Sequence, residues 1–170
     1  MHLRARTAAL AALVLIVATG AAGAAARGPL RADLDGEPIA LEDVANYDCH
    51  DADYPLIHCY RSSADLDDSL ARYTAEAGAE AVTAGTAYVR AYRDATFSGG
   101  SFTFSQNYAN LESIGWNDRI SSLQSLNCGR GEFREHANYL GFVYTFYCGS
   151  LITYVGDYYN DKFSSVERLP

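Results

Sequence analysis

No common signature of an enzyme occurs in these 170 residues. The chain has no G-x-S-x-G nucleophile elbow, no H-E-x-x-H zinc motif and no phosphate-binding P-loop. Its four histidines are scattered without catalytic spacing. The acidic residues from Asp65 to Asp68 are best explained as the solvated start of a helix. We therefore expect a protein that is not an enzyme.

Basic residues are scarce as well. The chain has 13 Lys and Arg residues against 21 Asp and Glu residues, for a formal net charge of −8. Nucleic acids and anionic membranes bind basic surfaces, so we expect neither as a partner. An acidic balance raises the local concentration of divalent cations, but only as a background field.

Long hydrophobic runs are almost absent. The run from Ala8 to Thr19 follows Arg4 and Arg6, and it is too short to span a bilayer of about 30 Å. Ala24-Ala25-Ala26 then fits an A-x-A cleavage site. We expect a signal peptide over residues 1–26 rather than an uncleaved anchor, followed by secretion. The mature chain would carry a net charge of about −10 and form one domain, or a small domain with an appendage.

Four cysteines in an exported chain predict disulfides, with three possible connectivities. We expect Cys49–Cys59 and Cys128–Cys148, because each is the nearest pairing in sequence and lies within one proposed unit. The segment CHDADYPLIHC between the first two could also be a Cys₂His₂ zinc site. Adjacent Cys-His pairs lack the spacing that lets two ligands converge, so a disulfide-closed loop is the better interpretation.

Acidic residues gather around this first cysteine pair. Asp48, Asp51 and Asp53 have neither the spacing nor the central glycine of an EF-hand. We expect them to form a solvated acidic loop.

Residues 27–87 form an N-terminal segment whose sequence pattern differs from that of the rest of the chain. Ser62, followed three residues later by Asp65, predicts a helix start, and we expect a helix from about Ala64 to Glu80 followed by a linker. The apolar residues at helical spacing are Leu66, Leu70 and Tyr73. The segment is therefore expected to hold a short helix and a disulfide loop.

Residues 88–170 have the pattern of β-structure. Phe102 and Phe104 alternate with Ser101, Thr103 and Ser105, which predicts a half-buried strand. Aromatic residues are dense, and glycines mark turns between short runs. This pattern favours an all-β sandwich or barrel.

A six-residue pattern occurs twice in this half. NDRISS spans Asn117 to Ser122, and NDKFSS spans Asn160 to Ser165, 43 residues later. Recurrence at that distance predicts two structural units with the same loop. Carboxylate, amide, hydroxyl and carbonyl oxygens are the ligands that calcium prefers, and they suit zinc or copper poorly.

A second repeat precedes each hexapeptide, in which two aromatic residues are followed by a glycine after one further residue. The first unit has Tyr92, Phe97 and Gly99, and the second has Phe133, Tyr139 and Gly141. The glycines are 42 residues apart and suit a tightly folded hairpin that needs positive φ. We expect the aromatic side chains to pack over that hairpin.

Together these motifs resemble the βγ-crystallin family, whose Greek-key motifs carry an aromatic-x₄-aromatic-x-Gly signature. Its microbial calcium-binding members carry N/D-N/D-x-x-S/T-S late in each motif. The resemblance covers about Tyr88 to Pro170. One departure is that Phe133 and Tyr139 are separated by five residues instead of four. The resemblance implies an all-β, two-Greek-key βγ-crystallin-type sandwich, preceded here by a small α+β N-terminal segment and the signal peptide.

The resemblance also implies two calcium sites shared between the hexapeptides, with Asp carboxylates, Ser hydroxyls, backbone oxygens of the basic residues, and Asn side chains that orient or ligate. The implied metal-site residues are Asn117, Asp118, Arg119, Ser121, Asn160, Asp161, Lys162 and Ser164. Ser122 and Ser165 are expected to stabilise the fold by hydrogen bonds. The residues expected in the core are Trp116, Ile120 and Phe163, with Tyr159 the counterpart of Trp116.

We therefore expect a secreted, monomeric calcium-binding protein in which Ca²⁺ mainly stabilises the structure. The alternative is an extracellular proteinase inhibitor, since some secreted metalloproteinase inhibitors share this fold. Its reactive loop would be Tyr54 to Ile57, or a loop near Cys128. In that case an extracellular proteinase would be a partner besides calcium.

Overall fold

The computed structural model of this protein describes residues 28–77 and 87–170. The strands are β1 Arg31–Leu34, β2 Glu37–Ile39, β3 Asp48–His50, β4 Leu56–Tyr60, β5 Val89–Asp94, β6 Ser98–Phe104, β7 Ser122–Ser125, β8 Gly131–His136, β9 Leu140–Phe146, β10 Leu151–Ile152 and β11 Ser165–Arg168. The helices are α1 Ser63–Ala77 and three 3₁₀ helices, η1 Leu41–Asn46, η3 Leu111–Ile114 and η4 Ala137–Tyr139.

Some sequence predictions concern residues outside these ranges. The expected signal peptide, the last three residues of the expected helix and most of the linker lie outside the described residues. The start of that helix is confirmed. The Asp65 backbone N–H donates to the Ser62 hydroxyl (3.2 Å), and this hydroxyl donates to the Asp65 carboxylate (2.6 Å). Within the described parts of the chain, no helix is long and apolar enough to cross a membrane.

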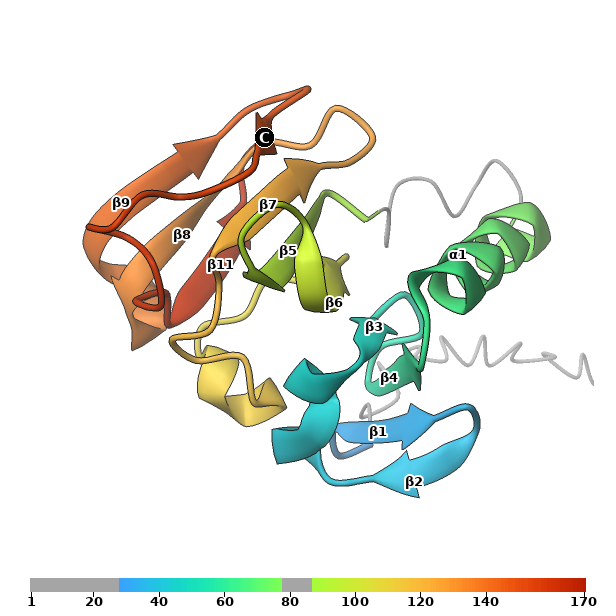
Figure 1. Cartoon of the computed structure of the whole chain (residues 1–170). Coiled ribbons are helices and arrows are strands. Elements are labelled where there is room, and N and C mark those ends of the chain that lie inside the picture. Colours follow the sequence, from blue (N-terminus) through green and yellow to red (C-terminus); the bar gives the residue numbers. More distant parts are fainter. Residues whose placement is uncertain (1–27, 78–86) are drawn as a thin grey trace, which may run out of the picture.

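The strands form a larger sheet of eight strands and a smaller sheet of three (Figure 1). The larger has the order β10-β7-β5-β6-β3-β4-β1-β2, and the smaller has the order β11-β8-β9. The antiparallel pairs β5–β6 and β8–β9 begin the two units of the C-terminal half. Strands then cross between units, because β10 pairs with β7 and Tyr108 bridges Val166 of β11. This exchange makes two interlocked Greek keys, and it confirms the expected fold class.

The N-terminal segment extends the larger sheet. Strand β3 pairs in parallel with β6, and β4, β1 and β2 follow outward. At the junction the chains approach closely: a Cβ on Gly100 would lie 2.5 Å from the Ala45 carbonyl oxygen. The predicted boundary at 87/88 adjoins residues outside the described ranges and stays a prediction, but the larger sheet runs across it.

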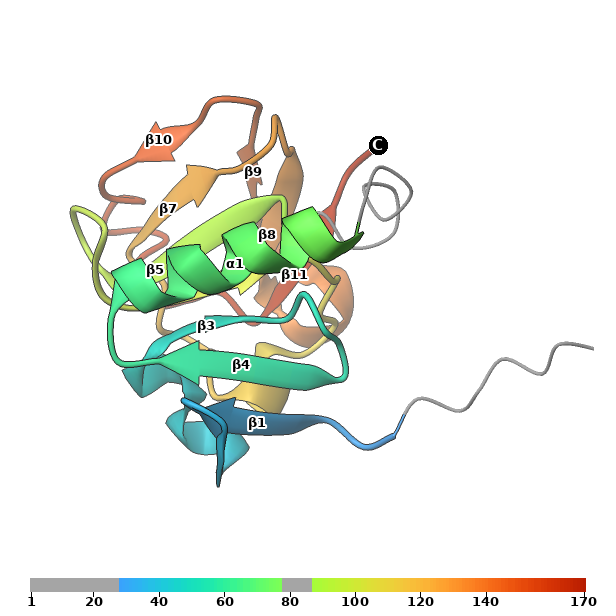
Figure 2. The same ribbon diagram turned by 90° about the vertical axis from the view of Figure 1, so that its right-hand side faces the viewer.

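Helix α1 covers the outer face of the larger sheet (Figure 2). Its Leu66 is fully buried. Arg90 of β5 is buried beneath the helix, and its guanidinium donates to Asp67 of α1 (2.6 Å) and to Thr103 of β6 (2.8 Å). The half-buried pattern predicted for β6 is therefore wrong. Ser101 and Thr103 are fully buried, because elements from the N-terminal segment cover their side of the strand.

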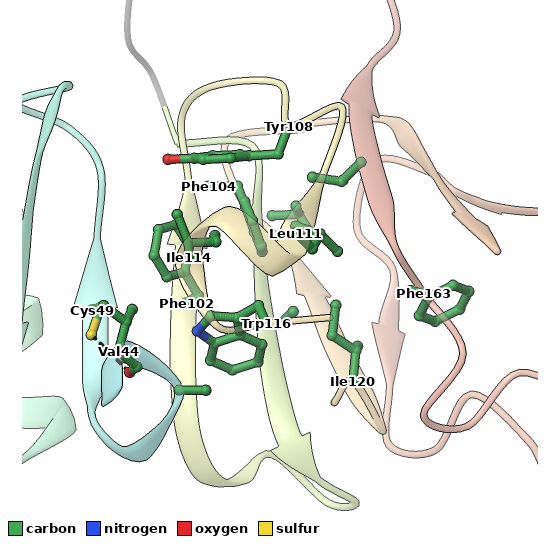
Figure 3. Close-up of a cluster of buried hydrophobic side chains, with 14 of the residues drawn as sticks. Val44, Cys49, Phe102, Phe104, Tyr108, Leu111, Ile114, Trp116, Ile120 and Phe163 are labelled. Carbon is green, nitrogen blue, oxygen red and sulfur yellow. Dashed lines mark hydrogen bonds between the residues drawn. The ribbon is translucent and has the colours of Figure 1, made fainter. Parts of the chain in front are cut away.

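One hydrophobic core serves both halves of the chain. Trp116, Ile120 and Phe163 are fully buried, as expected, and Tyr159 packs against them from a partly buried position. Val44 and Cys49 of the N-terminal segment lie beside this cluster (Figure 3). The core therefore joins the segment to the Greek keys.

Both expected disulfides, Cys49–Cys59 and Cys128–Cys148, are confirmed. Strands β3 and β4 are antiparallel, with Cys49 opposite Cys59 and His50 opposite His58. Alternation along a strand puts the cysteines on the core face and the histidines on the face toward α1. The near-palindrome CHDADYPLIHC is explained by this pairing, and the four side chains do not converge as a zinc site.

The solvated acidic loop expected in this segment is wrong for Asp51. Its side chain is fully buried and accepts hydrogen bonds from the backbone amides of Ser105 (2.6 Å) and Gln106 (3.2 Å). Asp48 is partly buried and accepts from the Ser101 hydroxyl (2.5 Å). Asp53 is exposed, as expected. Two of the three carboxylates therefore bind the N-terminal segment to β6 and the residues after it.

Candidate metal site

Two equivalent hairpins support the hexapeptide loops. Thr96 and Phe97 in the first, and Asn138 and Tyr139 in the second, have φ between 57° and 62°. Each is followed by a glycine with positive φ, Gly99 or Gly141, where other residues would be strained. In the first hairpin the rings of Tyr92 and Phe97 pack together, with centroids 5.5 Å apart. The two units thus share one local conformation.

The last serine of each hexapeptide holds its hairpin in place. Ser122 accepts from the Phe97 amide (3.1 Å) and donates to the Asp94 carbonyl (2.6 Å). Ser165 accepts from the Tyr139 amide (3.2 Å) and donates to the His136 carbonyl (2.8 Å). Both serines are fully buried. Their expected role in stabilising the fold is borne out by these bonds.

The backbone corrects the alignment of the aromatic repeat. The Ser121 amide donates to the Tyr92 carbonyl (3.0 Å), and the Ser164 amide donates to the Arg134 carbonyl (2.8 Å). Arg134, not Phe133, is therefore the counterpart of Tyr92, and the second hairpin has no extra residue. Phe133 is buried in the core instead. The aromatic-glycine motif does not point to the carbonyl group of Arg134 as the counterpart of that of Tyr92. Applying the 42-residue spacing of the two glycines to Tyr92 would have identified it.

The two hexapeptide loops lie side by side and exchange backbone hydrogen bonds. The Asp118 amide donates to the Phe163 carbonyl (3.0 Å), and the Asp161 amide donates to the Ile120 carbonyl (3.3 Å). Both aspartates have left-handed backbones, with φ of 53° and 54°. The reciprocal bonds bring each aspartate next to the apolar and serine positions of the other loop.

Side chains follow the same reciprocal arrangement at one of the two positions. The Asp118 carboxylate accepts from the Ser164 hydroxyl of the other loop and from the Asn117 amide group (2.8 Å). Burial raises the pKa of the Asp118 carboxyl above its ordinary value; these two hydrogen bonds oppose the rise, and the charges of Asp161 and Glu135 add to it. Like charges close together favour a cation between them.

The second loop repeats part of this pattern. The Asn160 amide group donates to the Asp161 carboxylate (2.7 Å), so both asparagines orient the following aspartate. The Asn160 Oδ1 atom is buried without a hydrogen-bond partner. A buried acceptor such as Asn160 Oδ1 is costly unless a donor or a cation satisfies it. Ser121, the hydroxyl residue of the other loop, is also buried, at 7% exposed.

The two basic residues do not obstruct the loops. Arg119 and Lys162 are both exposed, and Lys162 Nζ donates to the Tyr158 carbonyl (2.8 Å) and lies over the Tyr158 ring. Within residues 28–77 and 87–170, no group of three or more His, Cys, Asp and Glu side chains could hold a metal. Each hexapeptide brings one carboxylate, so the other donors here are hydroxyl, amide and carbonyl oxygens.

The second half of the first candidate inhibitory loop is held in the larger sheet, whereas Tyr54 at its start is exposed. Leu56 and Ile57 belong to β4, which pairs with β3 on one side and β1 on the other. Ile57 is fully buried. A proteinase could not reach the Leu56–Ile57 bond without opening the sheet.

The chain resembles solved structures of crystallin domains over about half its length. A double mutant of a βγ-crystallin domain from Clostridium beijerinckii is 30% identical; the match covers 49% of this chain and 97% of that one, with a TM-score of 0.43. A clostrillin double mutant in complex with nickel is 26% identical, with 50% and 100% covered and a TM-score of 0.44. A βγ-crystallin from an archaeon is 24% identical, with 49% and 99% covered and a TM-score of 0.44.

No protein-family model matches the chain, and no curated protein matches it. The sequence identity of 30% nevertheless extends over 97% of a solved βγ-crystallin domain. On that identity, the chain belongs to the βγ-crystallin family.

Proposed function

We propose that this protein is a secreted, non-enzymatic calcium-binding protein in which Ca²⁺ stabilises the folded state. The observation that carries the proposal is the reciprocal contact of the two hexapeptide loops, in which Asp118 meets Ser164 and Asp161 meets the backbone of Ile120. Two hard-oxygen donor sets would thereby be shared across the pair of loops, and neither loop could supply them alone.

The donors fit calcium better than other ions. Asp118 with Ser164, and Asp161 with Ser121, would each supply one carboxylate and one hydroxyl, while Lys162 and Arg119 would supply backbone oxygens. Asn117 and Asn160 would orient the carboxylates, and the buried Asn160 Oδ1 has an unused lone pair for the ion or its water. Oxygen-only donor sets suit calcium and lack the soft ligands that zinc and copper prefer.

The expected affinity is modest. One carboxylate serves each ion, and low ligand charge weakens calcium binding; extracellular modules of this kind bind at about 10⁻⁴–10⁻³ M. Binding to the folded state alone stabilises it by RT ln(1 + [L]/Kd). The melting temperature of the mature chain should therefore rise with added Ca²⁺ and fall with a chelator. An unchanged midpoint would exclude a stabilising role.

Calorimetric titration of paired variants tests the sharing of ligands. Asp118→Ala and Ser164→Ala should abolish the same binding event, and the double variant should lose nothing more. Asp118→Ala combined with Ser121→Ala should abolish both events. Asp68→Ala, at an exposed position on α1, is the control and should bind as the wild type does. If Asp118→Ala and Ser121→Ala instead removed the same event, each loop would bind its own ion.

Export is tested separately from calcium. Expression of the full chain should give a protein outside the cytoplasm whose N-terminal residue is Arg27, since cleavage is proposed after Ala26. Removal of residues 1–26 should retain the protein inside the cell. Retention of the intact leader on the exported protein would support an anchor instead.

A further inference from the structure

A row of polar side chains crosses the outer face of the larger sheet beneath helix α1. Its members, in register across β5, β6, β3, β4 and β1, are Arg90, Thr103, His50, His58 and Asp33. His50 is 1% exposed, and Thr103 is fully buried. Helices usually pack on a sheet through an apolar face. The contact between α1 and this face is therefore of an uncommon, polar kind.

Helix α1 lies across this row (Figure 2) but buries little apolar surface against it. Among residues 63–75, whose exposure the structure describes, Leu66 is the only buried side chain. Leu66 does not belong to the core cluster that joins the two halves of the chain. The helix could therefore leave the sheet without opening that core.

Polar contacts hold the helix instead. Asp67 of α1 accepts from the Arg90 guanidinium (2.6 Å). The Ser69 hydroxyl accepts from the Tyr60 hydroxyl (2.7 Å) and lies 3.1 Å from His50 Nε2. Each contact of this kind adds only modest net stability, because undocking exchanges it for hydrogen bonds to water. The attachment of α1 therefore depends on the charge states of the groups that it meets.

His50 fits beneath the helix only as a neutral ring. The Ala52 amide donates to Nδ1 (3.2 Å), so the single proton of the ring is on Nε2, which faces Ser69. A second proton on the ring would put one N–H group against the N–H group of Ala52. It would also bury an additional cation beside Arg90. Proton binding at His50 therefore opposes the docking of α1.

The other titratable and charged groups around His50 come from every element packed against it. They are His58 and Tyr60 of β4, Arg90 of β5, Asp67 and Tyr73 of α1, Asp51 as the next residue, and Asp33 and Asp53 beyond His58. The carboxylates of Asp33 and Asp53 pair with the His58 ring (2.9 and 3.6 Å). The charges that act on His50 itself are those of His58 and Arg90, and both disfavour a further proton.

We propose that α1 is a cover released by acid: a proton taken up by His50 detaches the helix from the sheet, while the Greek keys and the core stay folded. The face that is uncovered is polar, so release exposes no apolar patch and should be reversible. The proposal concerns the N-terminal segment and does not depend on calcium.

The direction of the pH effect follows from the burial of His50. With α1 docked, the pKa of His50 is lowered to about 3, mainly by burial. With α1 detached, the ring meets water and should titrate near its ordinary pKa of about 6.5. The equilibrium constant between detached and docked helix, the opening constant, should therefore rise about 70-fold from pH 6 to pH 4. Asp51 stays buried in both forms, because it is bound to backbone amides outside α1.

Amide hydrogen exchange of the protein at pH 4, 5 and 6, corrected for intrinsic exchange rates, tests this proposal. A detached helix of 15 residues is marginal in water, so the amides of α1 should exchange whenever it opens. The opening constant of α1 should rise about 70-fold from pH 6 to pH 4 and return to its first value on neutralisation. The amides of β6 should remain protected throughout.

Three variants identify the group responsible. His50→Gln should remove the pH dependence of α1 opening, because glutamine does not titrate. His136→Gln is the matched control, since it makes the same change at an exposed histidine of the second Greek key, and it should keep the wild-type dependence. Ser69→Ala should increase opening at every pH without changing that dependence. The fluorescence of buried Trp116 verifies that each variant is folded.

Three results would each overturn the proposal. One is a wild-type opening constant of α1 that does not change between pH 6 and pH 4. Another is a folded His50→Gln variant with the wild-type dependence on pH. The third is exchange of α1 only together with β6, because the helix would then open only when the whole protein unfolds.

Discussion

His50 and Asp51 are neighbours, and both are buried, yet burial shifts their pKa values in opposite directions. The pKa of His50 is lowered to about 3, mainly by burial and in smaller part by the charges of His58 and Arg90. The neutral ring is held by Ser69 at Nε2 (3.1 Å) and by the Ala52 amide at Nδ1 (3.2 Å).

Asp51 behaves in the opposite way. Burial raises the pKa of its carboxyl to about 6, although the backbone amides of Ser105 and Gln106 oppose the rise. The folded protein therefore holds a proton at Asp51 at a pH where the unfolded chain has released it. At His50 the unfolded chain binds the proton and the folded protein does not.

The contributions of these two pKa shifts to the pH dependence of the free energy of unfolding should cancel in the wild type between about pH 4 and pH 6. In His50→Gln the Asp51 contribution remains, so stability should rise as pH falls, by up to about 1.4 kcal/mol per pH unit. In Asp51→Asn the His50 contribution remains, so stability should fall as pH falls. Urea unfolding at pH 4, 5 and 6 measures the slopes relative to wild type. Asp68→Asn is the control. If the free energy of unfolding had the same slope against pH in the wild type and all three variants, the cancellation would be contradicted.

Single residues were predictable from the sequence where their environment is local. The hexapeptide serines are an example: Ser122 and Ser165 contact hairpins in their own units, and the repeat identifies both. Asp51 was not predictable in this way. Its partners Ser105 and Gln106 are 54 and 55 residues away, and a carboxylate between histidine and alanine in a polar loop gives no local sign of burial.

At the level of secondary structure, the contact between the N-terminal segment and β6 depends on one glycine. Ser101 donates its amide to the Tyr47 carbonyl (3.1 Å), so the two backbones run together beside Gly100. A Cβ on Gly100 would lie 2.5 Å from the Ala45 carbonyl oxygen and 2.9 Å from that of Tyr47. Backbone on both sides leaves no flexible side chain that could move away.

Gly100→Ala should therefore destabilise the protein by about 1–3 kcal/mol, the usual cost of overpacking. Gly28→Ala is the control, because a Cβ there meets no atom within 4 Å and its φ is not positive. The free energy of unfolding in urea provides the comparison. Equal stability of the two variants would mean that the N-terminal segment is not held against β6 in solution.

Elements were predictable in type but not in their surroundings. Alternation of Phe102 and Phe104 with polar residues correctly indicated the strand β6, but not the burial of its polar side. Asp48 of β3 lies 53 residues before its partner Ser101, and Asp67 of α1 lies 23 residues before Arg90. Periodicity within a strand describes its own two faces and contains no information on what a distant segment lays over them.

The molecule as a whole should unfold as one cooperative unit, because one sheet and one core join its two halves. Trp116, the single tryptophan, is buried in that core and reports on it by fluorescence. Ile57→Ala, in the N-terminal segment, should move the unfolding transition seen by Trp116 to a lower urea concentration. The free energy of unfolding should fall by about 2–5 kcal/mol, the cost of truncating a buried side chain. Far-UV circular dichroism should give the same midpoint. A Trp116 transition that is unaffected would indicate two independent domains.

The parallel pairing of β3 with β6 also has a consequence for the order in which the chain assembles. During synthesis the β3–β4 hairpin emerges early, and its two adjacent strands, with Cys49 opposite Cys59, need no later residue in order to pair with each other. The outer side of β3 gains its partner only after residues up to Phe104 have been made. Non-local parallel pairing of this kind is slow to form. The first part of the protein to be synthesised must therefore wait for the Greek keys, which act as the template on which it completes its fold.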